Sequence, residues 1–175
     1  SLKIHCLYTN SNFNLNKMDT KKSIDVLNAF IGINNNRFES YIAASRQTNE
    51  LDLKTLFVVF QEKSKRCKAE LVSEVEKLGG IPAEKPTAIL YVFRIWMEIK
   101  SKFNIKDREE ILNRCEYDAD LTLKKYNNIL RNNIEHLTPK HQNMLKAQHQ
   151  SIKKDHDTLK GLGDLLVTCR RFNLD

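Results

Sequence analysis

Helix breakers are scarce in this chain, and their positions constrain its fold more than any other feature of the sequence. Only 5 of its 175 residues are glycine and only 3 are proline. These two residues are the least tolerated in helix interiors, so segments without them permit long uninterrupted helices. The sequence Gly79-Gly80 followed by Pro82 predicts the end of one helix, and Thr138-Pro139 predicts the start of another.

Apolar residues recur at helical spacing in four long segments, and each segment predicts an amphipathic helix. The predicted helices cover residues 23–47, 51–78, 107–133 and 138–169. A short extra helix over residues 87–102 is expected inside the connection between the second and third helices. No segment shows the strict apolar–polar alternation of a strand. The sequence therefore predicts an all-α fold.

The lengths of the connections between these helices predict the topology of the bundle. The first and last connections are tight turns, whereas the connection after Gly79-Gly80 is long enough to cross the whole bundle. A long second connection makes the second and third helices parallel. This arrangement is the ferritin-like variant of the antiparallel four-helix bundle.

Hydrophobic residues make up 41% of the chain and charged residues 29%, which is typical of one globular domain. We expect this bundle domain over residues 21–170. Residues 1–20 lack helical periodicity, so we expect an amino-terminal extension that is poorly structured or derived from cloning, with Met18 as the native start.

Composition also argues against several kinds of partner. No segment approaches the ~20 apolar residues that span a bilayer, and no export signal is apparent, so no membrane partner and a cytoplasmic location are expected. The four cysteines are widely spaced, which is typical of reduced thiols. The net charge is +7, but basic and acidic residues are interleaved, so a solvated surface is favoured over a nucleic-acid interface.

Several short motifs occur in a fixed order between residues 22 and 165. They are Arg37-Phe38-Glu39-Ser40-Tyr41, Lys68-Ala69-Glu70-Leu71, Trp96-Met97, Cys115-Glu116 with Asp120 and Tyr126, and Gln148 with His156-Asp157. In this order and spacing the chain resembles an uncharacterised bacterial four-helix-bundle family, a domain of unknown function in the ferritin-like superfamily. Two positions depart from that family, Ser40 where glycine is expected and Ala119 where an acidic residue is expected. The resemblance implies the fold and a bacterial cytosolic setting but no known activity.

A ferritin-type di-iron centre needs a glutamate from each of two helices and a Glu-x-x-His motif from each of the other two. No Glu or Asp in this chain has a His three residues later. Counting residues from the turns places Glu39, Glu116 and His156 at one height in the bundle. His156 is expected to point inward, Glu116 to lie on the shoulder of its apolar stripe, and Glu39 to lie further round, toward the outside. These three residues are the candidate ligands for a single ion, iron or another divalent metal.

The alternative interpretation of this layer is structural, and the sequence favours it. A buried or half-buried His156 would then be hydrogen-bonded to a polar neighbour, since buried polar groups need partners. The available neighbours are Asn34, Tyr41, Cys115, Glu116 and Gln148. Cys115 has no His or Asp companion that would activate it as a nucleophile, so no catalytic residue is predicted.

Three hypotheses for function follow. The favoured one is a non-catalytic bundle, stress-associated or scaffolding, that acts by association and forms a homo-oligomer through apolar residues past Leu162 or on the crossover helix. The second is a degenerate ferritin-like protein that binds one metal ion through Glu116, His156 and Glu39. DNA binding through the positive charge is the weakest of the three.

Overall fold

The computed structural model describes residues 2–83 and 108–172, and every regular element within these two ranges is a helix. The elements are α1 (Leu2–Gln47), α2 (Leu51–Lys77), α4 (Arg108–Asn133), the 3₁₀ turn η1 (Ile134–His136) and α5 (Pro139–Phe172). The predicted short helix over residues 87–102 lies outside the described residues.

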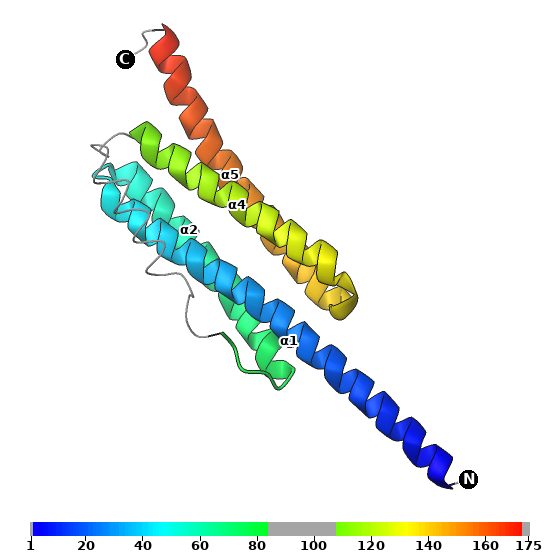
Figure 1. Cartoon of the computed structure of the whole chain (residues 1–175). Coiled ribbons are helices and arrows are strands. Elements are labelled where there is room, and N and C mark those ends of the chain that lie inside the picture. The colour runs from blue at the N-terminus through cyan, green and yellow to red at the C-terminus, as the bar shows by residue number, and fades with distance from the viewer. Residues whose placement is uncertain (1, 84–107, 173–175) are drawn as a thin grey trace.

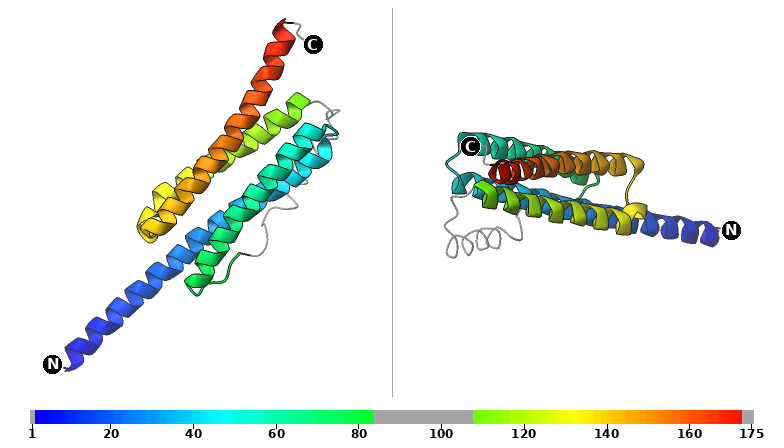
Figure 2. Two further views of the ribbon diagram at one scale, coloured as in Figure 1. Left: turned by 180° about the vertical axis from the view of Figure 1, so that it is seen from behind. Right: turned by 90° about the horizontal axis from the view of Figure 1, so that it is seen from above.

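The four helices form two antiparallel hairpins, α1 with α2 and α4 with α5 (Figure 1). α2 and α4 run in the same direction, so α2 ends and α4 begins at opposite ends of the bundle. α1 packs against α2 and α4, and α5 packs against α4 (Figure 2). Side chains of α5 also contact α2, as in the hydrogen bond from Gln148 to Glu70. The predicted ferritin-like four-helix topology is confirmed, with α1 and α5 on one diagonal.

The predicted helix ends are close to the observed ones, and local chemistry explains them. Gly79 adopts a φ of 74°, in the left-handed region that favours glycine, directly after α2 ends. A Cβ atom at Gly80 would lie 2.8 Å from the Ile24 side chain, so this turn packs directly on α1. At the start of α5, the Thr138 hydroxyl accepts a hydrogen bond from the backbone N–H of His141 at 3.2 Å.

The structure differs from the sequence-based expectation at the amino-terminal end. Residues 2–20 continue α1 as helix, whereas a poorly structured extension was expected there. Residues 1–31 contain neither glycine nor proline, so nothing in the backbone interrupts a helix that propagates upstream from the bundle. The division of the chain near residue 20 remains a prediction.

Two apolar clusters fill the bundle, one toward each end. The first apolar cluster lies toward the α1–α2 turn and includes Tyr41, Leu53, Phe57, Phe60, Ile111, Leu112, Cys115 and Leu159. The second apolar cluster lies toward the α4–α5 turn and includes Leu27, Phe30, Ile31, Leu71, Val75, Leu145 and Ile152. Burying each large apolar side chain contributes about 1.5–3 kcal/mol, so these clusters supply most of the stability.

Candidate functional site

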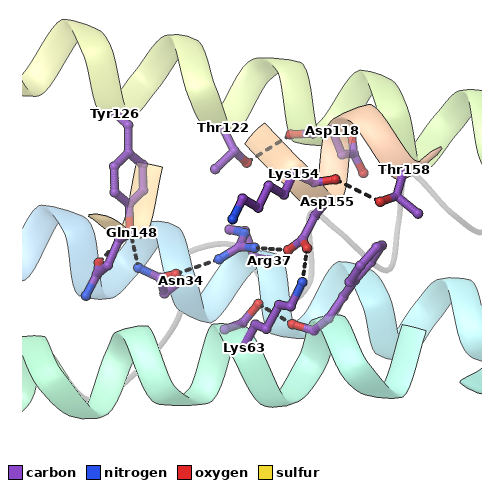
Figure 3. A network of polar contacts seen from close by, with 12 residues as sticks. Asn34, Arg37, Lys63, Asp118, Thr122, Tyr126, Gln148, Lys154, Asp155 and Thr158 are labelled. Atoms are coloured by element: carbon purple, nitrogen blue, oxygen red, sulfur yellow. Dashed lines mark hydrogen bonds and ion pairs between the residues drawn. The ribbon is translucent and has the colours of Figure 1, made fainter. Parts of the chain in front are cut away.

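Between the two apolar clusters, the interior of the bundle is polar (Figure 3). Its buried members come from all four helices, and we call them the polar layer. They are Asn34 and Arg37 of α1, Ser64 of α2, Tyr126 of α4, and Gln148 and Asp155 of α5, joined by the partly buried Lys63 of α2. This layer occupies the level at which the sequence placed a possible metal site.

An ion-pair cluster forms one half of the polar layer. The carboxylate of Asp155 is fully buried, and its Oδ2 lies 3.1 Å from Nη2 of Arg37, whose side chain is 4% exposed. Its Oδ1 accepts a hydrogen bond from Nζ of Lys63. Burial raises the pKa of Asp155, and the two neighbouring cations act in the opposite direction. One buried carboxylate is thus held between two cations from α1 and α2.

A chain of neutral hydrogen bonds forms the other half. Nδ2 of Asn34 donates to the hydroxyl of Tyr126 at 2.6 Å, and that hydroxyl donates to Oε1 of Gln148 at 3.0 Å. Nε2 of Gln148 then donates to the Glu70 carboxylate at 2.8 Å. Burial raises the pKa of Tyr126, which keeps its hydroxyl protonated as a donor.

A single contact joins the two halves of the layer. Nη1 of Arg37 donates to Oδ1 of Asn34 at 2.9 Å, so the guanidinium bonds to an amide and a carboxylate at once. The complete network therefore ties α1 to α2, α4 and α5. Buried networks of this kind are costly to disrupt, because each lost partner leaves another buried polar group unpaired.

The structure brings together two of the three predicted metal ligands. Nε2 of His156 lies 3.9 Å from Oε1 of Glu116, and its Nδ1 lies 3.1 Å from Oδ1 of Asp157. Glu39 lies on α1 and is partly exposed. Within residues 2–83 and 108–172, no three His, Cys, Asp or Glu side chains are grouped so that they could hold a metal ion.

The sequence placed this layer at the height along the bundle where the structure has it. It assigned the inward position on α5 to the wrong residue. His156 was expected to point inward with Ile152 and Leu159, yet its side chain is 19% exposed and lies at the edge of the bundle. Asp155 takes the inward position instead and is fully buried. Between residues 145 and 159, the buried residues of α5 follow alternating spacings of three and four, at Leu145, Gln148, Ile152, Asp155 and Leu159.

Sequence reasoning missed Asp155, Arg37 and Lys63 as interior residues because charged side chains are rarely buried. The spacing of inward residues along the last helix nonetheless indicates Asp155. Continuing the alternating spacing from Gln148 and Ile152 leads to Asp155, one residue before the histidine that was chosen. A buried aspartate needs a cation, which points to the partners Arg37 and Lys63.

The polar layer does not fit a ferritin-type di-iron centre. Such a centre needs several inward carboxylates and imidazoles. Here the guanidinium of Arg37 fills the interior and both oxygens of Asp155 bind cations. Positive charge at this position repels a divalent cation, and Glu70, the other carboxylate in contact, already accepts from Gln148.

The buried thiol and phenol groups do not offer a nucleophile. Burial raises the pKa of Cys115, and the nearby Asp118 raises it further, which disfavours the reactive thiolate. Burial likewise raises the pKa of Tyr41. None of the helices within residues 2–83 and 108–172 contains an apolar stretch that could span a lipid bilayer.

Comparison with known proteins agrees with this architecture. The family described as "Domain of unknown function (DUF2383)" matches residues 22–132, which is more than half of the chain, so the chain belongs to that family. The match leaves the whole of α5, including Gln148 and Asp155, outside the family region. No curated protein matches the chain.

A solved structure is also similar. It is a two-domain protein from Anabaena variabilis with DJ-1/ThiJ/PfpI-like and ferritin-like domains, at a TM-score of 0.64 and 16% identity. The similarity covers 83% of this chain but only 40% of that protein. At this identity the likeness shows the fold alone. The chain is therefore a ferritin-like helical protein in a family of unknown function.

Proposed function

We propose that this member of the DUF2383 family is a non-catalytic ferritin-like bundle that acts by associating with other protein surfaces. The observation that carries the proposal is the Arg37–Asp155–Lys63 cluster in the bundle interior. A buried carboxylate saturated by two cations fixes the helices relative to one another but offers no site for a substrate or metal. The interior residues thus hold the helices in position, and we assign binding of other proteins to the surface of the bundle.

Exposed apolar side chains support the proposal that the protein binds other protein surfaces. Leu165, Val167 and Phe172 near the end of α5 are 61%, 45% and 65% exposed. Exposed apolar residues gathered on one element mark interaction surfaces more often than scattered single ones do. The bacterial cytoplasmic setting implied by the family resemblance belongs to this proposal, and so does a stress-associated role for the association. The thiols of Cys67, Cys115 and Cys169 are free, which is consistent with a cytoplasmic setting.

Metal analysis tests whether the protein lacks an iron site and iron-oxidising activity. The purified protein is incubated anaerobically with excess ferrous iron, desalted, and measured by plasma mass spectrometry. We expect far less than one iron per chain, and no acceleration of iron oxidation when oxygen is admitted. Stoichiometric iron that survives desalting would contradict the proposal.

A second candidate function rests on the Glu116–His156 pair at 3.9 Å. Together with Glu39 from α1, this pair would bind one divalent ion at the edge of the bundle, since imidazole and carboxylate both suit iron and zinc. Titration calorimetry with zinc and iron distinguishes this candidate from the first. Stoichiometric binding that is lost in His156→Ala but kept in His136→Ala, a histidine near the α4–α5 turn, would favour the metal-binding function.

A further inference from the structure

We infer that the bundle opens along the contact between α2 and α5, while the contact between α1 and α4 acts as the hinge. The two hairpins meet along these two contacts, which we call the α2–α5 seam and the α1–α4 hinge. Each hairpin stays intact as the seam opens. Such an opening is a property of the bundle interior and goes beyond the proposed association with other proteins.

The seam and the hinge differ in how closely their helices approach. The backbones of α1 and α4 lie close together at several positions, whereas those of α2 and α5 scarcely approach each other within residues 51–77 and 139–172. Small buried residues, Ala44 on α1 and Ala119 on α4, are suited to the close approach at the hinge. The seam is instead spanned by long side chains, and Figure 3 shows Lys63 reaching from α2 to Asp155 on α5.

Long polar side chains bridge the α2–α5 seam, and most of them end at the surface. The bridges are Lys63–Asp155, Gln148–Glu70, Lys140–Glu74 and His141–Glu74. Lys63 is 26% exposed, and both Lys140 and Glu70 are exposed. Glu74 is buried, but Lys77 on its own helix stays beside it when the seam opens. Water and the remaining partners can therefore replace the broken bonds, which lowers the cost of opening.

Polar bonds at the α1–α4 hinge have no such compensation. Nδ2 of Asn34 donates to the hydroxyl of Tyr126, and both residues are fully buried. Breaking this bond would leave two polar groups in the interior without each other. Arg37 belongs to the hinge helix α1, so it remains near Asp155 as a counter-ion when Lys63 withdraws with α2. The hinge is therefore the more costly contact to separate.

Two thiols of this chain report separately on the seam and the hinge. Cys67 of α2 lies at the seam, since its carbonyl oxygen accepts a hydrogen bond from Nε2 of Gln148 at 3.1 Å. Cys115 of α4 belongs to the first apolar cluster together with Ala44 of α1. Both thiols are buried, so each reacts with a thiol reagent only when the structure around it opens. Opening of the seam exposes Cys67 and leaves Cys115 covered.

Labelling with iodoacetamide, followed by peptide mass spectrometry, tests the inference. The variant Cys6→Ser/Cys169→Ser removes the other two thiols, and labelling of the urea-unfolded protein gives the reference rates. Relative to these rates, we expect Cys67 to react at least about ten-fold faster than Cys115 and with a weaker dependence on urea, as local openings do. Equal rates with the same steep dependence on urea would overturn the inference, and so would faster reaction at Cys115.

Removing a bridge from the seam should accelerate labelling at Cys67 alone. Lys63→Met should raise the ratio of the Cys67 rate to the Cys115 rate about five-fold, the effect of one net hydrogen bond. The matched control is Lys65→Met, because Lys65 lies over the Phe38 ring of α1, away from the seam, and its loss should leave the ratio unchanged. Cys115 in the same sample reports global unfolding, so the ratio corrects for any change in overall stability.

A second variant tests the seam at an exposed position, where folding is not at risk. Glu70→Ala removes the acceptor of Gln148 and should raise the same ratio about two-fold. Glu62→Ala is its control, since Glu62 is exposed on the same helix and pairs with Lys65 there. Ratios that stay at the wild-type value in both Lys63→Met and Glu70→Ala would show that these bridges do not hold the seam closed, which would overturn the inference.

Discussion

The polar layer and the two apolar clusters share the same four helices, yet their energetics are opposite. An apolar cluster gains stability from every side chain it removes from water, and its members are interchangeable within limits of volume. The polar layer gains little net stability, because the cost of dehydrating Arg37 and Asp155 offsets their attraction. It gains specificity instead, since the hydrogen bonds from Arg37 to Asn34 and Asp155 require one alignment of α1 with α5.

Removing one partner of the buried ion pair should have the largest effect. Asp155→Ala leaves the guanidinium of Arg37 buried without its carboxylate, so the free energy of unfolding should fall by about 3–5 kcal/mol. Urea denaturation followed by circular dichroism measures the loss. The matched control, Asp157→Ala, removes an exposed carboxylate and should change stability by no more than about 0.5 kcal/mol.

Replacing both Arg37 and Asp155 compares the buried ion pair with an apolar contact at the same place. Arg37→Met/Asp155→Leu converts the ion pair into an apolar contact, and buried pairs replaced in this way are often neutral or stabilised by about 1–4 kcal/mol. We therefore expect the double variant to regain at least the stability lost in Asp155→Ala. A double variant as unstable as the single one would show that the ion pair itself stabilises the fold.

A smaller loss is expected from the neutral half of the layer. Tyr126→Phe removes the hydroxyl between Asn34 and Gln148, leaving Oε1 of Gln148 without that donor. The free energy of unfolding should fall by about 1–3 kcal/mol. Tyr117→Phe, at a tyrosine that is 55% exposed, is the control and should have almost no effect.

Acid should act through Glu74, at the α2–α5 contact outside the polar layer. Hydrogen bonds from Lys140 and Lys77 lower the pKa of Glu74 to about 2 from its ordinary value of 4.5. Because the folded-state pKa is lowered, its stabilising contribution is present above about pH 4.5 and is lost as the pH falls toward 2. The melting temperature should fall less steeply over this range in Glu74→Gln than in the wild type.

The difference between the two melting curves isolates Glu74, because all other titrating groups, including Asp155, are common to both proteins. Glu76→Gln serves as the control, since Glu76 is exposed on the same helix. Parallel curves for wild type and Glu74→Gln would mean that this ion-pair cluster contributes nothing at neutral pH.

Most of the architecture was predictable from the sequence, because helix ends are governed by local chemistry. Gly79-Gly80 and Thr138-Pro139 placed boundaries within one residue of those observed, at Lys77–Leu78 and Pro139. The upstream extension of α1 was missed, since apolar periodicity reports packing and not the ability to be helical. A helix that leaves the bundle has no need of an apolar face.

The interior of the candidate site was only half predictable. Asn34 and Gln148 were identified because uncharged polar residues on an apolar stripe stand out. Asp155 was not identified, because the inward position on this helix was assigned to His156, which lies 100° from it. The spacing of buried residues along α5 points to Asp155, but its main partner, Arg37, lies 118 residues away in the sequence, and no local pattern identifies that pairing.

That separation has a consequence for the order of folding. Arg37 and Asp155 belong to the first and last helices, so their contact forms only after both hairpins exist and the long connection has closed. Contacts made after the rate-limiting step govern how fast a protein unfolds more than how fast it folds. Loss of the ion pair should therefore raise the unfolding rate, which shortens the lifetime of the native bundle, and leave the folding rate nearly unchanged.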